Sequence, residues 1–268
     1  MKKTNIQLLF FMAFVVLLSA CKKDTEVVLT DVTTTDTENV AAIMDEIGFF
    51  FEGNDLAQEA KGGRKGICYQ VTDSKTENEI VIEFESGCVS DDGKTRTGKM
   101  TYSWTGLDGQ SGFSSTIVYE NFSVDNHTID GTFMIKDMSL NLKDTSVSFT
   151  MVVENAKFTY PDGKFSNLNE TLTVTTEFAG HLTQEGNVDT KITGEVSGTT
   201  KEGNTYVALI TKELLIKATC EEGPVSGTFV FTINQDAPMR LDYGDGTCDA
   251  MATLTRGAFS KVIDFSKD

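Results

Sequence analysis

Apolar and polar residues alternate along most of the chain from about residue 66 onward. Successive side chains of a strand point to opposite faces of a sheet, so a period of two predicts strands with one buried face. Asp-Gly and related turn sequences separate the runs, which favours hairpins between neighbouring strands. The clearest alternating sets are Ile80, Ile82 and Phe84; Met100, Tyr102 and Trp104; Val147, Phe149, Met151 and Val153; Leu172, Val174, Thr176 and Phe178; and Phe229, Phe231 and Ile233.

A set of glycines spaced 30 to 33 residues apart indicates a repeated two-stranded unit in the same region. About 32 residues accommodate two strands of roughly ten residues and their turns. Seven such units give some fourteen strands, more than an open twisted sheet usually holds. We therefore predict an all-β fold, a long antiparallel meander that forms a β-sandwich or a partly open barrel. The glycines are Gly66, Gly98, Gly131, Gly163, Gly194, Gly227 and Gly257.

One helical pattern precedes the strands. Thr35-Asp36-Thr37-Glu38 offers a capping box, and Gly53-Asn54-Asp55 interrupts the apolar run that follows it. We predict a short amphipathic helix over about residues 38–52 that docks on the sheet, with a lid over a lipid pocket as the alternative. Its apolar positions are Val40, Ile43, Met44, Ile47, Phe50 and Phe51.

The first twenty residues have the pattern of a signal peptide. Lys2 and Lys3 precede an uncharged apolar run at residues 8–18, which is too short to span a bilayer. The run ends in Leu18-Ser19-Ala20-Cys21, the arrangement of a bacterial lipobox. We predict that residues 1–20 are removed and that Cys21 is lipidated, because two or more acyl chains give stable membrane anchoring.

The segment after the predicted cleavage site has no apolar periodicity. We predict a flexible tether at residues 21–36, followed by a single β-rich domain at 37–268 that includes the helix. Lys22-Lys23-Asp24-Thr25-Glu26 resembles the surface-export tags of Bacteroidota lipoproteins. The expected location is the outer membrane, with the cell surface favoured over the periplasmic face.

Four cysteines remain in the predicted mature chain: Cys68, Cys88, Cys220 and Cys248. An even number of cysteines in an exported protein predicts disulfides, and four allow three pairings. The local pairs Cys68–Cys88 and Cys220–Cys248 are favoured because each pair brackets a similar alternating segment. Each closed loop stabilises the fold by about 3 kcal/mol in the chain-entropy model.

The mature chain is strongly acidic. Without Lys2 and Lys3 it has 21 basic and 40 acidic residues, a net charge of −19. This charge repels nucleic acid and anionic lipid headgroups, and it favours solubility, cations or basic partners. We therefore expect no nucleic-acid partner.

The sequence offers few of the patterns that carry catalysis. It lacks a Gly-x-Ser-x-Gly elbow, a zinc-binding Cys-x-x-Cys, a phosphate loop and a dinucleotide fingerprint. His127 and His181, its two histidines, lie in polar contexts that favour solvated side chains over catalytic bases. A pair of carboxylates is harder to exclude, because 40 acids bring some of them together in any fold. We expect the protein not to be an enzyme.

The best metal candidate is an acidic turn near the C-terminus. Asp242, Asp245 and Asp249 surround two glycines, and calcium favours several oxygen ligands from a flexible loop. The spacing does not follow the EF-hand pattern, so a turn pinned by a disulfide is the other interpretation. Otherwise no cofactor is predicted.

Several of these features together resemble hypothetical secreted lipoproteins of Bacteroidota. They are the lipobox, the short acidic helix, the sequence Ile-Glu-Phe-Glu-Ser-Gly-Cys at 82–88 followed by the glycine-containing segment 91–100, and Leu-Asp-Tyr-Gly-Asp-Gly-Thr-Cys-Asp at 241–249. The resemblance covers most of the mature chain. It implies the address and the fold, and it implies no activity.

The sequence therefore predicts a lipid-anchored envelope protein with a non-enzymatic binding or structural role, attached to the outer membrane and facing an envelope or extracellular partner. Two alternatives remain at this stage. One is a carrier of apolar ligands, capped by the helix that contains Phe49-Phe50-Phe51. The other is a glycan-capture protein, for which Tyr69, Tyr119, Tyr160 and Tyr206 are the candidate platform.

Overall fold

The computed structural model describes residues 33–61, 69–73, 78–89, 93–106, 110–178, 188–220, 223–234 and 236–264. Within these ranges the chain forms one helix, α2 (Thr34–Lys61), and thirteen strands. The strands are β1 (Tyr69–Asp73), β2 (Glu79–Val89), β3 (Thr95–Thr105), β4 (Ser114–Val124), β5 (His127–Asn141), β6 (Ser146–Thr159), β7 (Phe165–Phe178), β8 (Val188–Thr199), β9 (Thr205–Ile216), β10 (Ser226–Ile233), β11 (Met239–Asp245), β12 (Met251–Arg256) and β13 (Phe259–Asp264).

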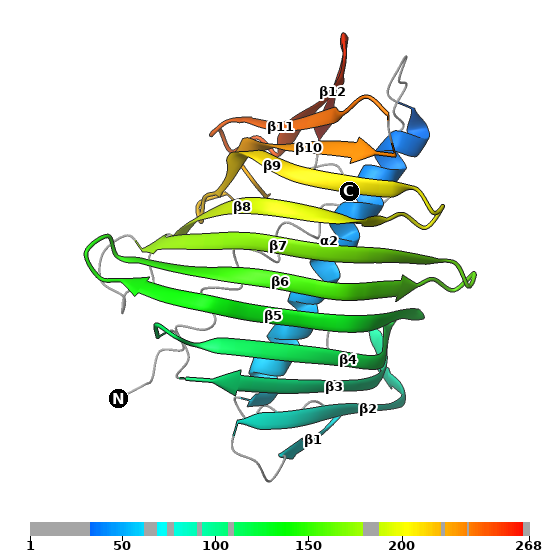
Figure 1. The fold of residues 1–268 in the computed structure, drawn as a ribbon, viewed down its shortest axis with the longest axis vertical. Helices are drawn as coiled ribbons and strands as arrows, with labels where there is room; N and C mark the ends of the chain where they lie inside the picture. Colours follow the sequence, from blue (N-terminus) through cyan, green and yellow to red (C-terminus); the bar gives the residue numbers. More distant parts are fainter. Residues whose placement is uncertain are drawn as a thin grey trace.

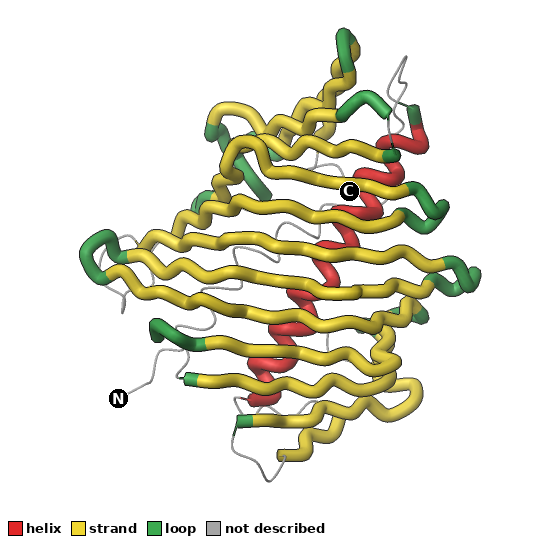
Figure 2. The backbone as a smooth tube through the Cα atoms, viewed as in Figure 1, coloured by secondary structure: helices red, strands yellow, loops and turns green. Residues whose placement is uncertain are grey.

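All the described strands belong to one antiparallel sheet, in which each strand pairs with its neighbours in the sequence. The sheet order runs from β1 to β13 without a crossover, and the sheet is not closed. The predicted all-β antiparallel meander is therefore confirmed. Helix α2 lies on one face of this sheet and crosses behind the strands (Figures 1 and 2).

The length of α2 matches the width of sheet that it crosses. Its first turn reaches Arg256 in β12, and its last residue reaches Trp104 in β3. Nine strand spacings separate β3 from β12, a distance of about 43 Å along a flat sheet. A helix of 28 residues is about 42 Å long. The helix is thus long enough to cross the sheet from β12 to β3.

The two faces of the sheet differ as the period-two pattern requires. In β9 the side chains of Tyr206, Ala208 and Ile210 are buried, whereas Val207 and Leu209 are exposed. The buried set belongs to one core cluster that also contains Ile43, Ile47 and Phe50 of the helix. We call the face that carries α2 the inner face and the opposite one the outer face.

The predicted helix boundaries of 38–52 are wrong at both ends. The helix begins at Thr34, because Thr33 and Asp36 form the capping box. The Asp36 amide donates to Thr33 Oγ1 (3.2 Å), and the Thr33 amide donates to Asp36 Oδ2 (2.9 Å). The last residues of the predicted tether, 34–36, are therefore helical.

At its other end α2 continues through Gly53-Asn54-Asp55 to Lys61. A glycine in a helix interior costs about 1 kcal/mol relative to alanine. The residues beyond it offset this cost, because Ala57 and Ala60 are almost fully buried. The helix is therefore not short, because its last residues also pack into the core against the sheet.

Four of the regularly spaced glycines lie in strands, at or next to shifts in the pairing register: Gly98, Gly131, Gly194 and Gly227. At Gly98 (φ 86°) an added Cβ would lie 2.1 Å from the carbonyl oxygen of Asn121. At Gly194 (φ 135°) it would lie 2.1 Å from that of Thr171. Such bulges bend strands and increase their twist. These glycines let neighbouring backbones approach closely where the sheet bends.

The remaining members of the glycine series have other roles. Gly163 and Gly257 occupy turns, and Gly66 lies outside the described residues. Among its described members, the glycine series therefore marks bulges at four positions and turns at two. Among the described helical residues no segment is both long and apolar enough to cross a bilayer.

Candidate functional site at the helix–sheet interface

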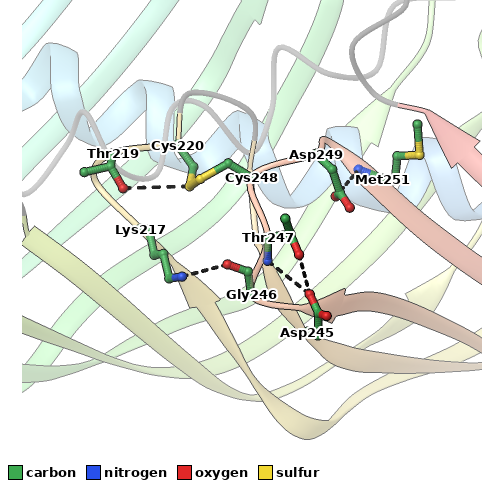
Figure 3. Close-up of a disulfide and its surroundings, with 9 residues drawn as sticks. All are labelled: Lys217, Thr219, Cys220, Asp245, Gly246, Thr247, Cys248, Asp249 and Met251. Carbon is green, nitrogen blue, oxygen red and sulfur yellow. Dashed lines mark hydrogen bonds between the residues drawn. A yellow bond between two sulfur atoms is a disulfide. The ribbon is translucent and has the colours of Figure 1, made fainter.

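The structure contains one of the two predicted disulfides in full. Cys220 and Cys248 are bonded, with their Cα atoms 5.5 Å apart and a sequence separation of 28 (Figure 3). Cys88 is also disulfide-bonded, but its predicted partner Cys68 lies outside the described residues. So does Cys21, and its lipidation stays a prediction.

The predicted calcium ligands bind their own turns instead of converging. Asp242 accepts hydrogen bonds from Arg240 (2.5 Å) and from the Gly244 amide (3.0 Å). Asp249 accepts one from the Met251 amide (3.2 Å). Asp245 accepts hydrogen bonds from the hydroxyl and amide of Thr247, which hold the pKa of Asp245 below its usual value (Figure 3).

A second contact tightens this turn without adding a metal ligand. Lys217 Nζ donates to the carbonyl oxygen of Gly246 (2.6 Å), which ties the turn to the end of β9 (Figure 3). Among the described residues no three Asp, Glu, His or Cys side chains are grouped as a metal site requires. The calcium prediction gains no support from this arrangement, which matches the alternative of a disulfide-pinned turn.

A different set of ionisable groups converges beneath α2. At the start of the helix, Arg256 donates from both terminal nitrogens to the two Asp36 oxygens, each at 2.7 Å. Burial by itself raises the pKa of Asp36, but hydrogen bonds from Arg256 and Thr33 outweigh burial and hold that pKa below its usual value. This charge-assisted pair fixes the first turn of the helix to β12.

Halfway along α2, a buried glutamate accepts two hydroxyl groups from the sheet. Glu46 is 5% exposed. Its Oε1 accepts hydrogen bonds from the Tyr160 hydroxyl and from the Ser166 hydroxyl, each at 2.5 Å. Burial and the nearby Glu46 carboxyl both raise the pKa of Tyr160 far above its usual value.

The sheet itself supplies the second acid of this region. It is Glu170, which lies four residues after Ser166 on the same face of β7. It is 2% exposed, and neither of its carboxyl oxygens has a hydrogen-bond partner among the described residues. Burial raises its pKa to about 8. Glu170 is therefore mostly protonated at neutral pH.

Tyr206 completes this group from β9. It is 2% exposed, and its hydroxyl has no hydrogen-bond partner in the described part of the chain. Burial is the main cause that raises the pKa of Tyr206, and the nearby carboxyls of Glu46 and Glu170 raise it further. The Tyr206 ring crosses Gly198, where an added Cβ would lie 3.0 Å from the hydroxyl oxygen.

We call Glu46, Tyr160, Ser166, Glu170 and Tyr206 the buried Glu–Tyr cluster. It combines two carboxyls with three hydroxyls in a region of low dielectric, where unpaired charge is costly. Its chemistry is that of groups that hold or exchange a proton. A substrate cannot reach either carboxyl unless α2 moves, because both are nearly inaccessible to solvent.

The sequence contains a signal for this cluster, but the period-two pattern alone did not predict it. Glu170 falls on the same alternation as Leu168, Leu172 and Val174, so it is an acid on an apolar face. Glu46 lies between Ile43 and Phe50 at helical spacing. A charged residue at a core position is the informative exception to apolar burial.

The aromatic and histidine candidates are placed as follows. Tyr119 and Tyr206 are buried, and Tyr69 and Tyr160 are half-buried, so the four do not form an exposed platform. His127 is half-buried with its ring edge-on to Tyr160. His181 lies outside the described residues.

The chain was also compared with known proteins. No protein-family model, curated protein or solved structure matches it.

Proposed function

We propose that the protein is an exported, lipid-anchored envelope protein with a non-enzymatic binding role, and that it contacts its partner through the outer face of the sheet. The observation that carries this proposal is the occupation of the inner face by α2 from β12 to β3. Phe50 illustrates the packing, with ring centroids 5.6 Å from Tyr119 and 5.3 Å from Phe158.

The outer face supplies a surface of a suitable kind for a protein partner. Hydroxyl side chains face one another across β6, β7 and β8, in the row Thr150, Thr173 and Thr193. Val207 and Leu209 of β9 expose about half of their surface beside these rows. Such a surface offers hydrogen-bond donors and acceptors beside a small apolar area that a partner can bury.

The burial of the Glu–Tyr cluster supports the non-enzymatic part of the proposal. A general acid must reach a proton on the substrate within hydrogen-bond distance. Glu46 and Glu170 are buried between the helix and the sheet, and the acids of the C-terminal turn accept hydrogen bonds from nearby backbone amides. A hydrolase screen on the purified protein tests this point. An activity abolished by Glu170→Gln would overturn it.

Two exposed leucines provide a matched test of the outer face. A photo-crosslinking amino acid placed at Leu209 probes the face, whereas the same group at Leu142 probes the turn between β5 and β6. We expect a discrete crosslinked protein in cells from position 209 and none from position 142. Equal labelling from both positions, or none from position 209, would contradict the proposed surface.

The lipid anchor is tested separately from the binding surface. The wild-type protein is expected to partition into the detergent phase of a cell extract, and Cys21→Ser is expected to stay in the aqueous phase. Identical partitioning of the two proteins would refute the lipid anchor. It would leave the proposed outer-face interaction untouched.

A second candidate function is the carriage of an apolar ligand, with α2 as a displaceable cover. The observation that favours it is the line of apolar side chains beneath the helix in a sheet that is not closed. Native mass spectrometry of the purified protein separates the two candidates. The leading proposal predicts the mass of the acylated chain alone, whereas a carrier retains an additional lipid.

A further inference from the structure

The last residue of α2 projects into a group of three aromatic rings. Lys61 Nζ lies 4.2 Å from the ring centroid of Trp104, 5.5 Å from that of Phe113 and 5.8 Å from that of Tyr102. A cation is attracted to the face of an aromatic ring at distances up to about 6 Å. The ammonium group of Lys61 is therefore within range of all three rings.

The three rings of this group come from β3 and from the residue that precedes β4. Tyr102 and Trp104 are two residues apart on one face of β3, with their rings stacked at 5.3 Å, and Phe113 directly precedes β4. Tyr102 and Phe113 are buried, and Trp104 is half-buried. The three rings therefore belong to β3 and to the entry of β4, whereas the ammonium group belongs to the helix.

Other lysines over rings in the described structure make simpler contacts. Lys157 lies over the single ring of Phe165 (4.7 Å), and Lys201 lies over that of Tyr160 (4.5 Å). Several aromatic faces around one ammonium group form the arrangement that proteins use to recognise organic ammonium ligands. Lys61 is also the only basic residue of α2.

We propose that Tyr102, Trp104 and Phe113 form a binding site for organic ammonium groups, and that Lys61 is the internal occupant with which such a ligand competes. We call these three residues the aromatic cage. The ligand class is a primary or quaternary ammonium, carried either by a free amine or by a lipid headgroup. This inference does not depend on the outer-face proposal, because the cage lies at the end of the helix on the inner face.

The competition has a consequence that can be measured. A group tethered beside its site has an effective concentration in the millimolar range, so a ligand must displace it. Removal of the Lys61 side chain should therefore strengthen the binding of an added ammonium ion at least roughly tenfold. The chain has one tryptophan, Trp104, so its fluorescence and its single indole N–H signal report directly on the cage.

The experiment titrates the full mature chain, in a maltoside detergent, with tetramethylammonium chloride against sodium chloride at equal ionic strength. Lys61→Ala should show a saturable change in Trp104 emission with an apparent Kd at least about tenfold lower than that of the wild type. Lys157→Ala, which removes a single-ring contact, should titrate as the wild type does. Lys61→Gln, with part of the side chain retained, should fall between Lys61→Ala and the wild type.

A correctly folded Lys61→Ala protein with no saturable response to tetramethylammonium would overturn the proposal. So would unfolding of both Lys61 variants by circular dichroism, because Lys61 would then be a structural requirement and not a displaceable occupant. Two further ligands distinguish the sources. Glycerophosphocholine binding more tightly than choline indicates a lipid headgroup, and equal binding indicates a free amine.

Discussion

Two buried carboxyls at the interface between α2 and the sheet have opposite surroundings. Asp36 meets both terminal nitrogens of Arg256 and the Thr33 cap, and its pKa lies below the usual value. Glu170 has no hydrogen-bond partner in the described structure, and burial raises its pKa to about 8. The comparison shows that burial alone does not set the charge of an interior acid. The partner at each position decides whether the helix is held by an ion pair or rests on a protonated acid.

The largest expected effect is a pH dependence that Glu170 creates. Its pKa rises from 4.5 in the unfolded chain to about 8 in the folded one, so the folded state retains a proton that the unfolded state has released. Its contribution to stability is complete below pH 4.5 and is lost as the pH rises through 8. The loss amounts to roughly 5 kcal/mol, at 1.36 kcal/mol per pKa unit.

Urea unfolding across this pH range checks the effect. Glu170→Gln should remove most of the decline in unfolding free energy between pH 5 and 9, whereas Glu154→Gln, an exposed acid of β6, should leave it unchanged. A Glu170→Gln protein with the same slope as the wild type would show that Glu170 is ionised and hydrated at neutral pH.

The pH dependence of stability that Asp36 creates at the start of the helix should have the opposite sign. Arg256→Met leaves a buried carboxylate without its ion-pair partner, and breaking a buried pair in this way costs about 3 kcal/mol of unfolding free energy. Because the folded pKa of Asp36 is lowered, its stabilisation is present above pH 3.8 and is lost as the pH falls below that value. Chemical unfolding at pH 7 and at pH 3 should show a smaller Arg256→Met effect at pH 3, and equal effects would contradict the pairing.

Two tyrosines allow the same comparison, between a buried group with a hydrogen-bond partner and one without a partner among the described residues, with smaller expected effects. Tyr160→Phe removes a hydroxyl that donates to Glu46, and should cost about 1 to 2 kcal/mol of unfolding free energy. Tyr206→Phe removes a hydroxyl without a hydrogen-bond partner among the described residues, and should be neutral or stabilising. Thermal unfolding of the two variants side by side tests the comparison, and it fails if Tyr206→Phe is the more damaging change.

An exposed ion pair should give the smallest effect. Arg240 and Asp242 are 2.5 Å apart, but the Arg240 side chain is 54% exposed. Exposed pairs of this kind contribute about 0 to 1 kcal/mol because water and salt screen them. Arg240→Met, measured under the conditions used for Arg256→Met, should therefore change the unfolding free energy by less than a third as much.

The meander was predictable because many of its strands carry their own period-two signal. Phe229, Phe231 and Ile233 are buried, as their alternation predicts. The extent of α2 was less predictable, since Gly53-Asn54-Asp55 is a local stop signal that tertiary packing overrides. The burial of Ala57 and Ala60 in the core stabilises the helix beyond this signal.

The buried Glu–Tyr cluster and the aromatic cage could not be predicted from the sequence, for a related reason. Tyr160 and Ser166 meet Glu46 across more than a hundred residues, and Lys61 meets Trp104 across the hairpins between them. Local periodicity places each residue on a face, but it does not show which faces come together. The Cys220–Cys248 bond was predictable because its two ends are close in the sequence and bracket one hairpin.

Hydrogen exchange of α2 in the intact protein tests most directly whether the helix is a permanent layer over the inner face. We expect amide protection over residues 40–60 at neutral pH comparable to that of β4 to β9, with a selective loss above pH 8 as Glu170 ionises. Rapid exchange throughout α2 at neutral pH, beside a protected sheet, would contradict it.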